Sequence, residues 1–345
     1  MCARAALALP LLLVSAAVTP QRGGAVQAQT AAPGQDFPAY LQLLAARARA
    51  EGVSEATIQR VTTGLTANPR VIDLDRSQPG SGNGPPAMAS YLRRHVDPHR
   101  IAGGRRIMGN SAAFLPEIER RYGVPAKMVI AIWGHETNYG SYTGDFDLAR
   151  SLATLAWEGR RRALFESEFI AVLKMADQGV PQGRLRGSWA GAFGNPQFLP
   201  SVYLTTAVDG DGDGSRDIWS SSADTLASIA NYFHLAGWRT GEPWGVGAAL
   251  PDGFDWSGVA TRLSSPSCGA VHGRHSAWLP VSEWRRRGVT PLAPIADDTL
   301  ATLFRPDGPG TRAFLLTGNY RVILQYNCSN YYALSVGLLA DEIAR

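Results

Sequence analysis

Residues 131–140, AIWGHETNYG, place one carboxylate at the end of an apolar run, and two kinds of chemistry use such an arrangement. A His-Glu pair begins the helix motif of zinc peptidases, in which a second histidine four residues after the first shares the metal. Tyr139 stands at that position after His135, and the other histidines form no matching pair. The sequence therefore excludes this zinc motif and leaves Glu136 as a lone acid.

Glu136 has the surroundings of a general acid. Residues 126–133 are mostly apolar, which predicts a buried helix, and Glu136 falls in the last turn of that helix. The negative end of the helix dipole and the surrounding hydrocarbon both favour the protonated carboxyl, as proton donation near neutral pH requires. A glutamate that simply leaves the helix end for solvent fits this segment equally well.

Two further stretches contain the residue types of a carbohydrate groove. Residues 188–203, SWAGAFGNPQFLPSVY, surround one amide, Gln197, with glycines and aromatics, so that the backbone can approach a ligand closely. Residues 325–333, QYNCSNYYA, place tyrosines and Asn327 where we expect a strand to join a helix. A glycine turn and core tyrosines are the simpler alternatives for these two stretches.

Together the three stretches resemble the membrane-bound lytic transglycosylase B family, whose members cut bacterial peptidoglycan. The family's helix end, G-x-E-[ST]-x-[FY]-G, is similar to residues 134–140, and its loop S-x-A-G-A-[MF]-G-x-x-Q-F-[ML]-P is similar to residues 188–200. Weaker similarity extends along the chain to VIDLDRSQP at 71–79, LATLA at 152–156, and the DIW, SIANYF and GW segments of 217–238. The resemblance covers nearly the whole mature chain in order.

This resemblance implies a lysozyme-like core in which Glu136 is the single catalytic acid and base. It also implies that the sugar subsites are lined by Ser188, Gln197, Tyr232, Tyr326, Asn327 and Tyr332. An ordinary glycosidase needs two carboxylates. A lytic transglycosylase needs only one, because the muramoyl 6-hydroxyl attacks internally and leaves a 1,6-anhydromuramoyl end. No cofactor is expected for this step. Two residues depart from the family: His135 replaces a small or apolar residue, and Gly80 replaces a frequent Glu.

Two alternative functions remain open at this point. A hydrolytic muramidase would cleave the same bond with water and would use Asp145 or Asp147 as its second carboxylate. A catalytically inactive peptidoglycan-binding scaffold would need no acid, and Glu136 in an apolar segment argues against it. The products separate the two enzymes, because hydrolysis adds water and transglycosylation does not.

Residues 209–217, DGDGDGSRD, resemble a calcium-binding loop. Oxygen-bearing side chains occupy positions 1, 3, 5 and 9 of an EF-hand pattern, and Gly214 occupies position 6. Position 12 is Ser220 instead of the usual Glu, so the regular loop is incomplete. The predicted ligands of a structural Ca²⁺ are Asp209, Asp211, Asp213 and Asp224. An acidic turn that binds no metal is an equally good interpretation.

Helical spacing dominates the chain and must position these groups. Residues 37–64, 107–136, 151–176 and 223–237 have it, whereas 243–306 is rich in Gly, Pro and Trp. β-like runs follow at 311–318 and 321–327, before a last helix. The expected fold is α+β and mainly α, with a small β-containing insertion late in the chain. The expected regions are a signal peptide (1–28), an N-terminal helical region (29–104), a lysozyme-like catalytic core (105–245), a Gly/Pro-rich and small β region (246–324), and a C-terminal helix that returns to the core (325–345).

The N-terminus and the composition indicate export and a glycan partner. Arg4 precedes an apolar run and a small-residue cleavage site at 26–28, which predicts a secretory signal and a periplasmic enzyme. No lipid-anchor cysteine follows the run, and no later stretch is a candidate transmembrane segment.

The formal charge of +4 suits an anionic cell-wall glycan as the partner. The absence of a nucleic-acid motif argues against nucleic acid. Other cell-wall enzymes are conceivable partners. Cys268 and Cys328 remain after cleavage, either as a disulfide or as two free thiols.

Overall fold

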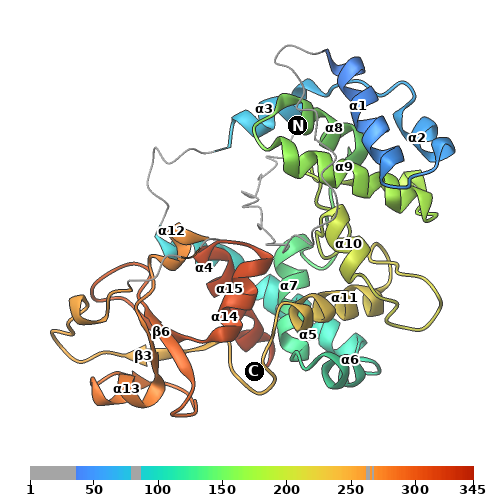
Figure 1. The fold of residues 1–345 in the computed structure, drawn as a ribbon. Coiled ribbons are helices and arrows are strands. Elements are labelled where there is room, and N and C mark those ends of the chain that lie inside the picture. The colour runs from blue at the N-terminus through green and yellow to red at the C-terminus, as the bar shows by residue number, and fades with distance from the viewer. Residues whose placement is uncertain (1–35, 79–86, 262–264, 266–267) are drawn as a thin grey trace, which may run out of the picture. The chain divides into compact units, whose positions relative to one another are not determined.

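The computed structural model describes residues 36–78, 87–261, 265 and 268–345, and Figure 1 shows their fold. They form two compact units, each of which joins segments that are far apart in the sequence. The first unit contains the described residues up to 78 and residues 136–228, and the second contains residues 87–135 and the described residues from 229 onward. The predicted signal peptide and Gly80 lie outside the described residues. None of the helices in the described ranges is both long and apolar enough to cross a membrane.

Helices make up most of the first unit. They are α1 (Phe37–Ala50), α2 (Glu55–Thr62), α3 (Pro69–Arg76), α8 (Leu148–Glu158), α9 (Arg162–Asp177) and α10 (Pro200–Thr206), with a short 3-10 turn at Gln182–Arg184. Helices α8 and α9 pack on one another, and α1 contacts both, as Figure 1 shows. Leu44, Phe165 and Phe169 are at most 2% exposed and belong to the core of this unit.

Local sequence explains where several of these helices begin and end. The side chain of Asp36 accepts the backbone N–H of Ala39 at the start of α1, which satisfies one of the free donors of the first turn. Gly159 ends α8 with a φ of 100°, a left-handed conformation that glycine adopts without a steric penalty. Residues 151–176, expected as one helical stretch, are therefore divided between α8 and α9.

A buried ion pair attaches α3 to the segment before α9. The side chain of Asp75 is 1% exposed, and its oxygens lie 2.6 Å from Nη2 of Arg161 and 3.3 Å from Nη1 of Arg160. A buried carboxylate needs such charge-assisted partners, because desolvation otherwise disfavours its ionised form. This pair gives the VIDLDRSQP segment a structural role within the first unit.

The second unit contains the last helix of the chain as its central element. Its helices are α4 (Met88–His95), α5 (Pro98–Asn110), α6 (Leu115–Tyr122), α12 (Gly269–His272), α13 (Val281–Arg286), α14 (Gly318–Tyr326) and α15 (Asn330–Ile343). Helix α15 contacts α4, α5 and α14, and residues 333–336 of it are fully buried. The boundary between the units falls inside α7 (Ala126–Thr137), after His135, and inside α11 (Ser222–Leu235), after Ser228.

A five-stranded antiparallel sheet with strand order β4-β6-β7-β3-β5 also belongs to the second unit. Its strands are β3 (Gly245–Ala249), β4 (Trp278–Pro280), β5 (Thr290–Pro291), β6 (Leu300–Phe304) and β7 (Ala313–Leu316). A cluster of buried apolar side chains that includes Trp284, Leu303 and Leu315 packs at this sheet. The indole Nε1 of Trp284 donates to the carbonyl of Ala301 at 2.9 Å, so the polar atom of this buried side chain is satisfied.

The prediction for residues 321–327 was wrong, because they form most of helix α14 instead of a strand. Thr317 caps this helix by accepting the N–H of Asn319. The Asn319 side chain donates to the carbonyls of Arg239 and Glu242 at 2.9 and 2.7 Å. These distant partners fix the start of the helix and are not evident in the local pattern. The tyrosine-rich segment therefore lies at a junction of two helices.

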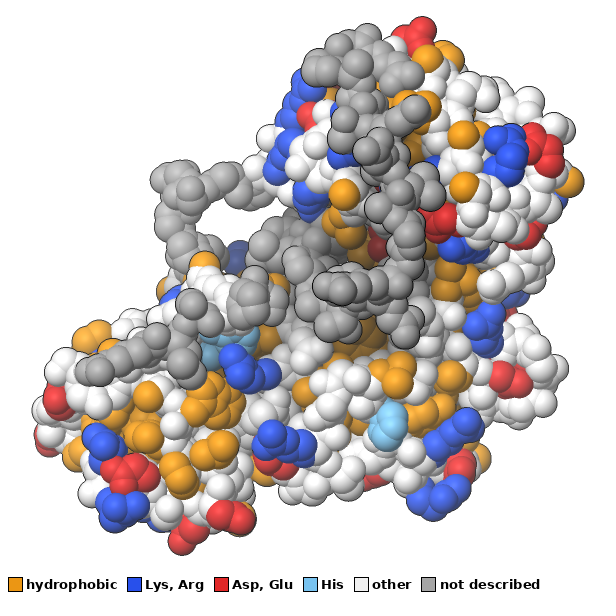
Figure 2. All heavy atoms as spheres, in the orientation of Figure 1, with side chains coloured by type: hydrophobic (Ala, Val, Ile, Leu, Met, Phe, Trp, Pro, Cys, Tyr) orange, Lys and Arg blue, Asp and Glu red, His pale blue; other side chains and the backbone are white. Residues whose placement is uncertain are grey.

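The predicted fold class, α+β and mainly α with a small sheet late in the chain, is confirmed. The structure also joins Cys268 and Cys328 as a disulfide, which connects the residue before α12 to the loop between α14 and α15. Figure 2 shows basic and acidic side chains interspersed over the visible face.

Candidate active site

Helix α7 presents Glu136 in its last turn, as the sequence predicts. The side chains of residues 128–133 are at most 4% exposed, so the helix is buried up to that turn, whereas Glu136 is partly exposed. Beyond the helix, Asn138, Tyr139 and Gly140 have φ angles of 49°, 59° and 83°. A left-handed backbone is costly for Asn and especially for Tyr, and such strain is retained chiefly at functional sites. The turn after Glu136 is therefore held in a specific conformation.

Thr137 and Asn195 hold this turn within the first unit. Thr137 Oγ1 accepts the N–H of Gly140 at 3.0 Å and donates to the carbonyl of Asn195 at 3.1 Å. Asn195 is 4% exposed, its N–H donates to the carbonyl of Ile218 at 2.9 Å, and its Nδ2 donates to Thr225 Oγ1 at 3.1 Å. Sequence reasoning did not identify Asn195, because its partners lie far away in the chain. Thr137 could have been suspected from its place beside Glu136.

A tight loop after β2 carries Ser188. Strands β1 (Phe146–Asp147) and β2 (Arg186–Gly187) pair antiparallel, and Ser188 follows directly. Ser188 Oγ accepts the N–H of Ala192 at 3.0 Å, and its backbone N–H donates to the carbonyl of the same residue at 2.7 Å. These two bonds to Ala192 fix the conformation of the loop that carries Ser188. The hydroxyl oxygen is the acceptor, so the bond does not use the hydroxyl hydrogen.

Gln197 has a left-handed backbone and a fixed amide. Its φ is 52°, and its Nε2 donates to the carbonyls of Thr143 and Gly194 at 3.1 and 3.0 Å. A side-chain amide has two N–H hydrogens, and these two bonds use both of them. Oε1 is then the atom of Gln197 that can accept a hydrogen bond from a ligand, for example from a sugar hydroxyl or acetamido N–H.

The two carboxylates of the hydrolase alternative lie in the same unit as Glu136. Asp147 is the N-cap of α8, and its Oδ1 accepts the N–H of Arg150 at 2.8 Å. Asp145 is exposed, and its backbone carbonyl accepts Nη1 of Arg186 at 2.7 Å. The cap gives Asp147 a structural role that does not depend on catalysis.

The predicted tyrosines lie together in the second unit. The ring centroids of Tyr232 and Tyr326 are 4.7 Å apart in an edge contact, and those of Tyr326 and Tyr332 are 6.4 Å apart and nearly parallel. The Tyr232 hydroxyl donates to the carbonyl of Gln325 at 2.9 Å. Burial raises the pKa of Tyr232, so this phenol stays protonated and acts as a neutral donor or acceptor.

Asn327 lies between α14 and α15, next to these rings. Its N–H donates to the carbonyl of Ile323 at 3.3 Å, and its own carbonyl accepts the N–H of Ser329 at 2.7 Å. The side-chain Oδ1 is buried and has no hydrogen-bond partner among the described residues. A buried acceptor without a partner carries a free-energy cost. A donor on a bound ligand would remove that cost.

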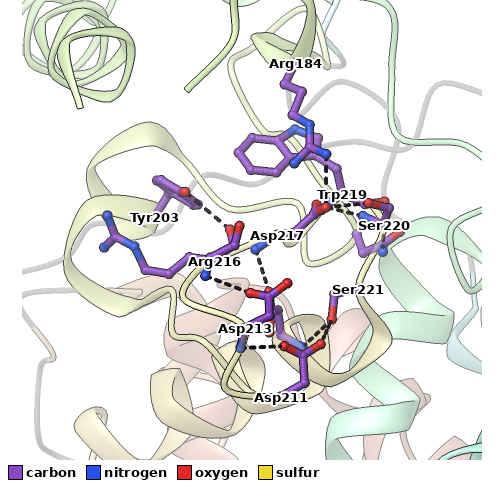
Figure 3. A network of polar contacts seen from close by, with 12 residues as sticks. Arg184, Tyr203, Asp211, Asp213, Arg216, Asp217, Trp219, Ser220 and Ser221 are labelled. Carbon is purple, nitrogen blue, oxygen red and sulfur yellow. Dashed lines mark hydrogen bonds and ion pairs between the residues drawn. The ribbon is translucent and has the colours of Figure 1, made fainter. Parts of the chain in front are cut away.

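Three of the predicted metal ligands gather in the acidic loop, which is shown in Figure 3. Carboxylate oxygens of Asp209, Asp211 and Asp213 lie within 4.8 Å of one another. Asp209 also accepts the backbone N–H groups of Gly212 and Gly214 at 2.6 and 2.8 Å. These bonds lower the pKa of Asp209, chiefly through the Gly214 N–H, and keep the group ionised. Three carboxylate oxygen donors on one turn suit a hard cation such as Ca²⁺.

Asp224 is not a member of this group. It is fully buried, and its two oxygens accept the backbone N–H groups of Gly210 and Asp217 at 2.7 and 2.6 Å. It therefore fastens both ends of the acidic loop to the start of α11. Its role in the structure is that of an internal acceptor, in contrast to the ligand role expected from the sequence.

Asp217 connects the loop to an aromatic cluster, and Figure 3 shows these contacts. It pairs with Arg184 at 3.0 Å and accepts the N–H of Trp219 at 3.0 Å. The guanidinium of Arg184 lies over the Trp219 ring at 5.4 Å, and the same ring lies 5.5 Å from that of Phe193 in the loop between Ser188 and Gln197. The acidic loop and the Gln197 loop therefore belong to one packed region of the first unit.

Proteins of known enzyme class are similar to this chain in sequence and in fold. Residues 36–341 match the family described as Transglycosylase SLT domain. The chain is 31% identical over 284 residues to membrane-bound lytic murein transglycosylase B of Escherichia coli (strain K12), covering 79% of this chain and 73% of that protein.

Solved structures agree with this assignment. SltB3 from Pseudomonas aeruginosa, in complex with NAG-anhNAM-pentapeptide, matches with a TM-score of 0.81 and 40% identity, covering 90% of this chain and 80% of that one. Escherichia coli lytic transglycosylase Slt35, in complex with calcium, matches with a TM-score of 0.72 and 27% identity, covering 88% and 92%. This chain therefore belongs to the SLT family of lytic transglycosylases.

Proposed function

We propose that this protein cleaves the β-1,4 bond between N-acetylmuramic acid and N-acetylglucosamine in peptidoglycan, with Glu136 as the only catalytic carboxylate. The observation that carries the proposal is the position of Glu136: a partly exposed acid at the end of a buried helix, followed by a strained turn. The family membership of the chain supports the same reaction class.

The proposed reaction uses Glu136 twice. First its carboxyl donates a proton to the glycosidic oxygen, and the bond from that oxygen to the anomeric carbon of the muramoyl residue breaks. The 6-hydroxyl of the same muramoyl residue then forms a bond to the anomeric carbon, and its proton passes to the Glu136 carboxylate. The products are a free 4-hydroxyl and a 1,6-anhydromuramoyl end. No water is consumed, and the enzyme returns to its starting protonation state.

The remaining site residues are proposed to bind the sugars. Among the described residues, the internal hydrogen bonds leave Gln197 Oε1 and Asn327 Oδ1 as acceptors for a ligand, and sugar hydroxyls and acetamido groups are matching donors. Tyr326 is partly exposed and offers an aromatic face, whereas Tyr332, also predicted to line the subsites, is 3% exposed. Tyr232 and Ser188 offer hydroxyls.

We also propose a structural Ca²⁺ at Asp209, Asp211 and Asp213. The clustered carboxylate oxygens support this site, and the related Slt35 was solved in complex with calcium. The ion would stabilise the loop that Asp217 and Asp224 attach to the rest of the unit. None of the bond-making or bond-breaking steps above involves it.

The location of the protein is proposed from residues 1–28, which have the pattern of a cleaved export signal. Peptidoglycan in the periplasm would then be the partner, and no other partner is needed for the reaction. Sequencing the N-terminus of the protein recovered from a periplasmic extract tests this point. A mature chain that still begins at Met1 would contradict it.

The decisive experiment replaces Glu136 with Gln and follows the muropeptides released from purified sacculi by mass spectrometry. The parent should release anhydro products, and Glu136→Gln should lower the rate roughly 10²–10⁴-fold, because the amide cannot donate the proton. Asp145→Asn and Asp147→Asn are the matched controls, and both should still release anhydro products. Products heavier by one water, or loss of activity in either Asp variant, would favour the hydrolase instead.

A further inference from the structure

His135, one residue before Glu136, is buried and packs against several aromatic rings. The side chain is 2% exposed and forms an edge contact with Tyr332, with ring centroids 4.6 Å apart and an interplanar angle of 65°. On another side it stacks on His95 at 5.2 Å and 15°, and His95 stacks on Tyr91 at 3.8 Å and 14°. The rings come from α4, α7 and α15, all within the second unit.

The hydrogen bonds of this cluster define the tautomer of His135. Ser335 Oγ donates its only hydrogen to the carbonyl of Tyr332 at 2.8 Å, so it can only accept from His135 Nε2, which lies 2.7 Å away. Nε2 therefore carries the proton. The other ring nitrogen, Nδ1, is buried and makes no hydrogen bond among the described residues. A second proton on Nδ1 would be buried without an acceptor, so the imidazole is neutral.

The charges around the cluster also favour the neutral ring. Burial, then the neighbouring His95 and Arg100, hold the pKa of His135 well below its ordinary value. Asp97, the N-cap of α5, is already bound to Arg100 at 2.6 Å. The titratable groups near the two histidines are Tyr91, Arg94 and His95 from α4, Asp97 and Arg100 from the start of α5, Tyr332 from α15, and Glu136 from α7 itself.

We propose that His135 is a positioning residue, which holds the last turn of α7 to α15 through Ser335 and packs against the ring of Tyr332. The last carbonyls of a helix lack internal partners, so its final turn frays unless side chains fix it. Glu136 lies in that turn, and Tyr332 is a proposed sugar contact.

This inference rests on the proposed function of Glu136, and kinetics on short soluble glycan strands test its catalytic part. His135→Phe keeps an aromatic ring but removes the donor, and it leaves Ser335 Oγ without its buried partner. It should lower kcat roughly 10–100-fold, since a displacement near 1 Å can cost about 100-fold. KM should change by less than about 3-fold, because most sugar contacts are kept. His135→Gln restores a neutral donor and should recover most of kcat.

A matched control is available in the same unit. His275 is 6% exposed and its Nε2 lies 2.8 Å from Asn330 Oδ1, so His275→Phe makes the same chemical change as His135→Phe at a similarly buried histidine. It should leave kcat within about 2-fold of the parent. Equal losses of kcat in His275→Phe and His135→Phe would show a general effect of destabilisation and would overturn the proposal. So would parental kcat in His135→Phe.

Nitrogen-15 NMR of the histidine rings gives a readout that does not depend on activity. His135 should show a protonated Nε2 and an unprotonated Nδ1, and should keep that state from pH 8 to below the ordinary histidine pKa of about 6.5. Ser335→Ala should weaken that preference and lower kcat as His135→Phe does, with no further loss in the double variant. A protonated Nδ1 at pH 7 would overturn the assignment. If Glu136→Gln remained active while these spectra appeared as expected, the proposed function would fail and the arrangement at His135 would stand.

Discussion

Acid should destabilise this protein through His275. Its ring is 6% exposed, packs against Phe304 and Tyr320 at 5.1 and 5.8 Å, and its Nε2 lies 2.8 Å from Asn330 Oδ1. Burial lowers the pKa of His275 from 6.5 to about 4. The unfolded chain therefore binds a proton before the folded chain does as the pH falls. The stabilisation is complete above about pH 6.5 and is lost as the pH falls toward 4.

The size of the effect follows from these two pKa values. At pH 5 almost all unfolded chains carry the proton on His275 and few folded chains do, so proton linkage predicts a loss of about 2 kcal/mol between pH 7 and pH 5. Urea unfolding at both pH values measures it. His275→Gln keeps a donor for Asn330 but cannot titrate, so its loss should be about 2 kcal/mol smaller than that of the parent. Equal losses in the two proteins would refute the reasoning.

Three further predictions concern the loops and the disulfide. A Cβ added at Gly144, whose φ is 92°, would lie 2.6 Å from the backbone N of Ser188. Gly144→Ala should therefore lower the free energy of unfolding, measured in urea, by about 1–3 kcal/mol or more and reduce activity. An unfolding curve equal to that of the parent would contradict this. Millimolar Ca²⁺ should raise Tm because only the folded chain has the acidic site, and Asp211→Asn should abolish the shift; identical melting curves in Ca²⁺ and in chelator would show a metal-free turn. Reduction of Cys268–Cys328, with 60 residues of sequence separation, should lower the unfolding free energy by about 4 kcal/mol; two reactive thiols in the unreduced, denatured protein would disprove the bond.

Much of the candidate site was predictable because its signals are local. Residues 128–133 form a run that can only be buried, and Glu136 follows it within one turn. The glycines around Gln197 likewise indicate a tight loop before any contact is known. Such features depend on a few neighbouring residues, and the sequence displays those neighbours in order.

The features that the sequence did not reveal depend on distant partners. Asn195 acquires its role from Ile218 and Thr225, and Asp224 becomes an internal acceptor because Gly210 and Asp217 direct their N–H groups at it. The β-branched residues of α14 fit a strand pattern equally well, and the buried Asn319 contacts decide for the helix. Side-chain spacing alone contains no information about these contacts.

The interleaved segments of the two units also set the order in which the chain can fold during synthesis. Helix α1 needs α8 and α9 to cover its apolar face, and both have emerged once the first unit is complete at residue 228. Helices α4 and α5 instead pack on α15, the last helix of the chain. Their partner surface does not exist until residues 330–343 have been synthesised. A premature stop after residue 228 would thus leave the unit of Glu136 with all of its segments and would deprive α4 and α5 of their core.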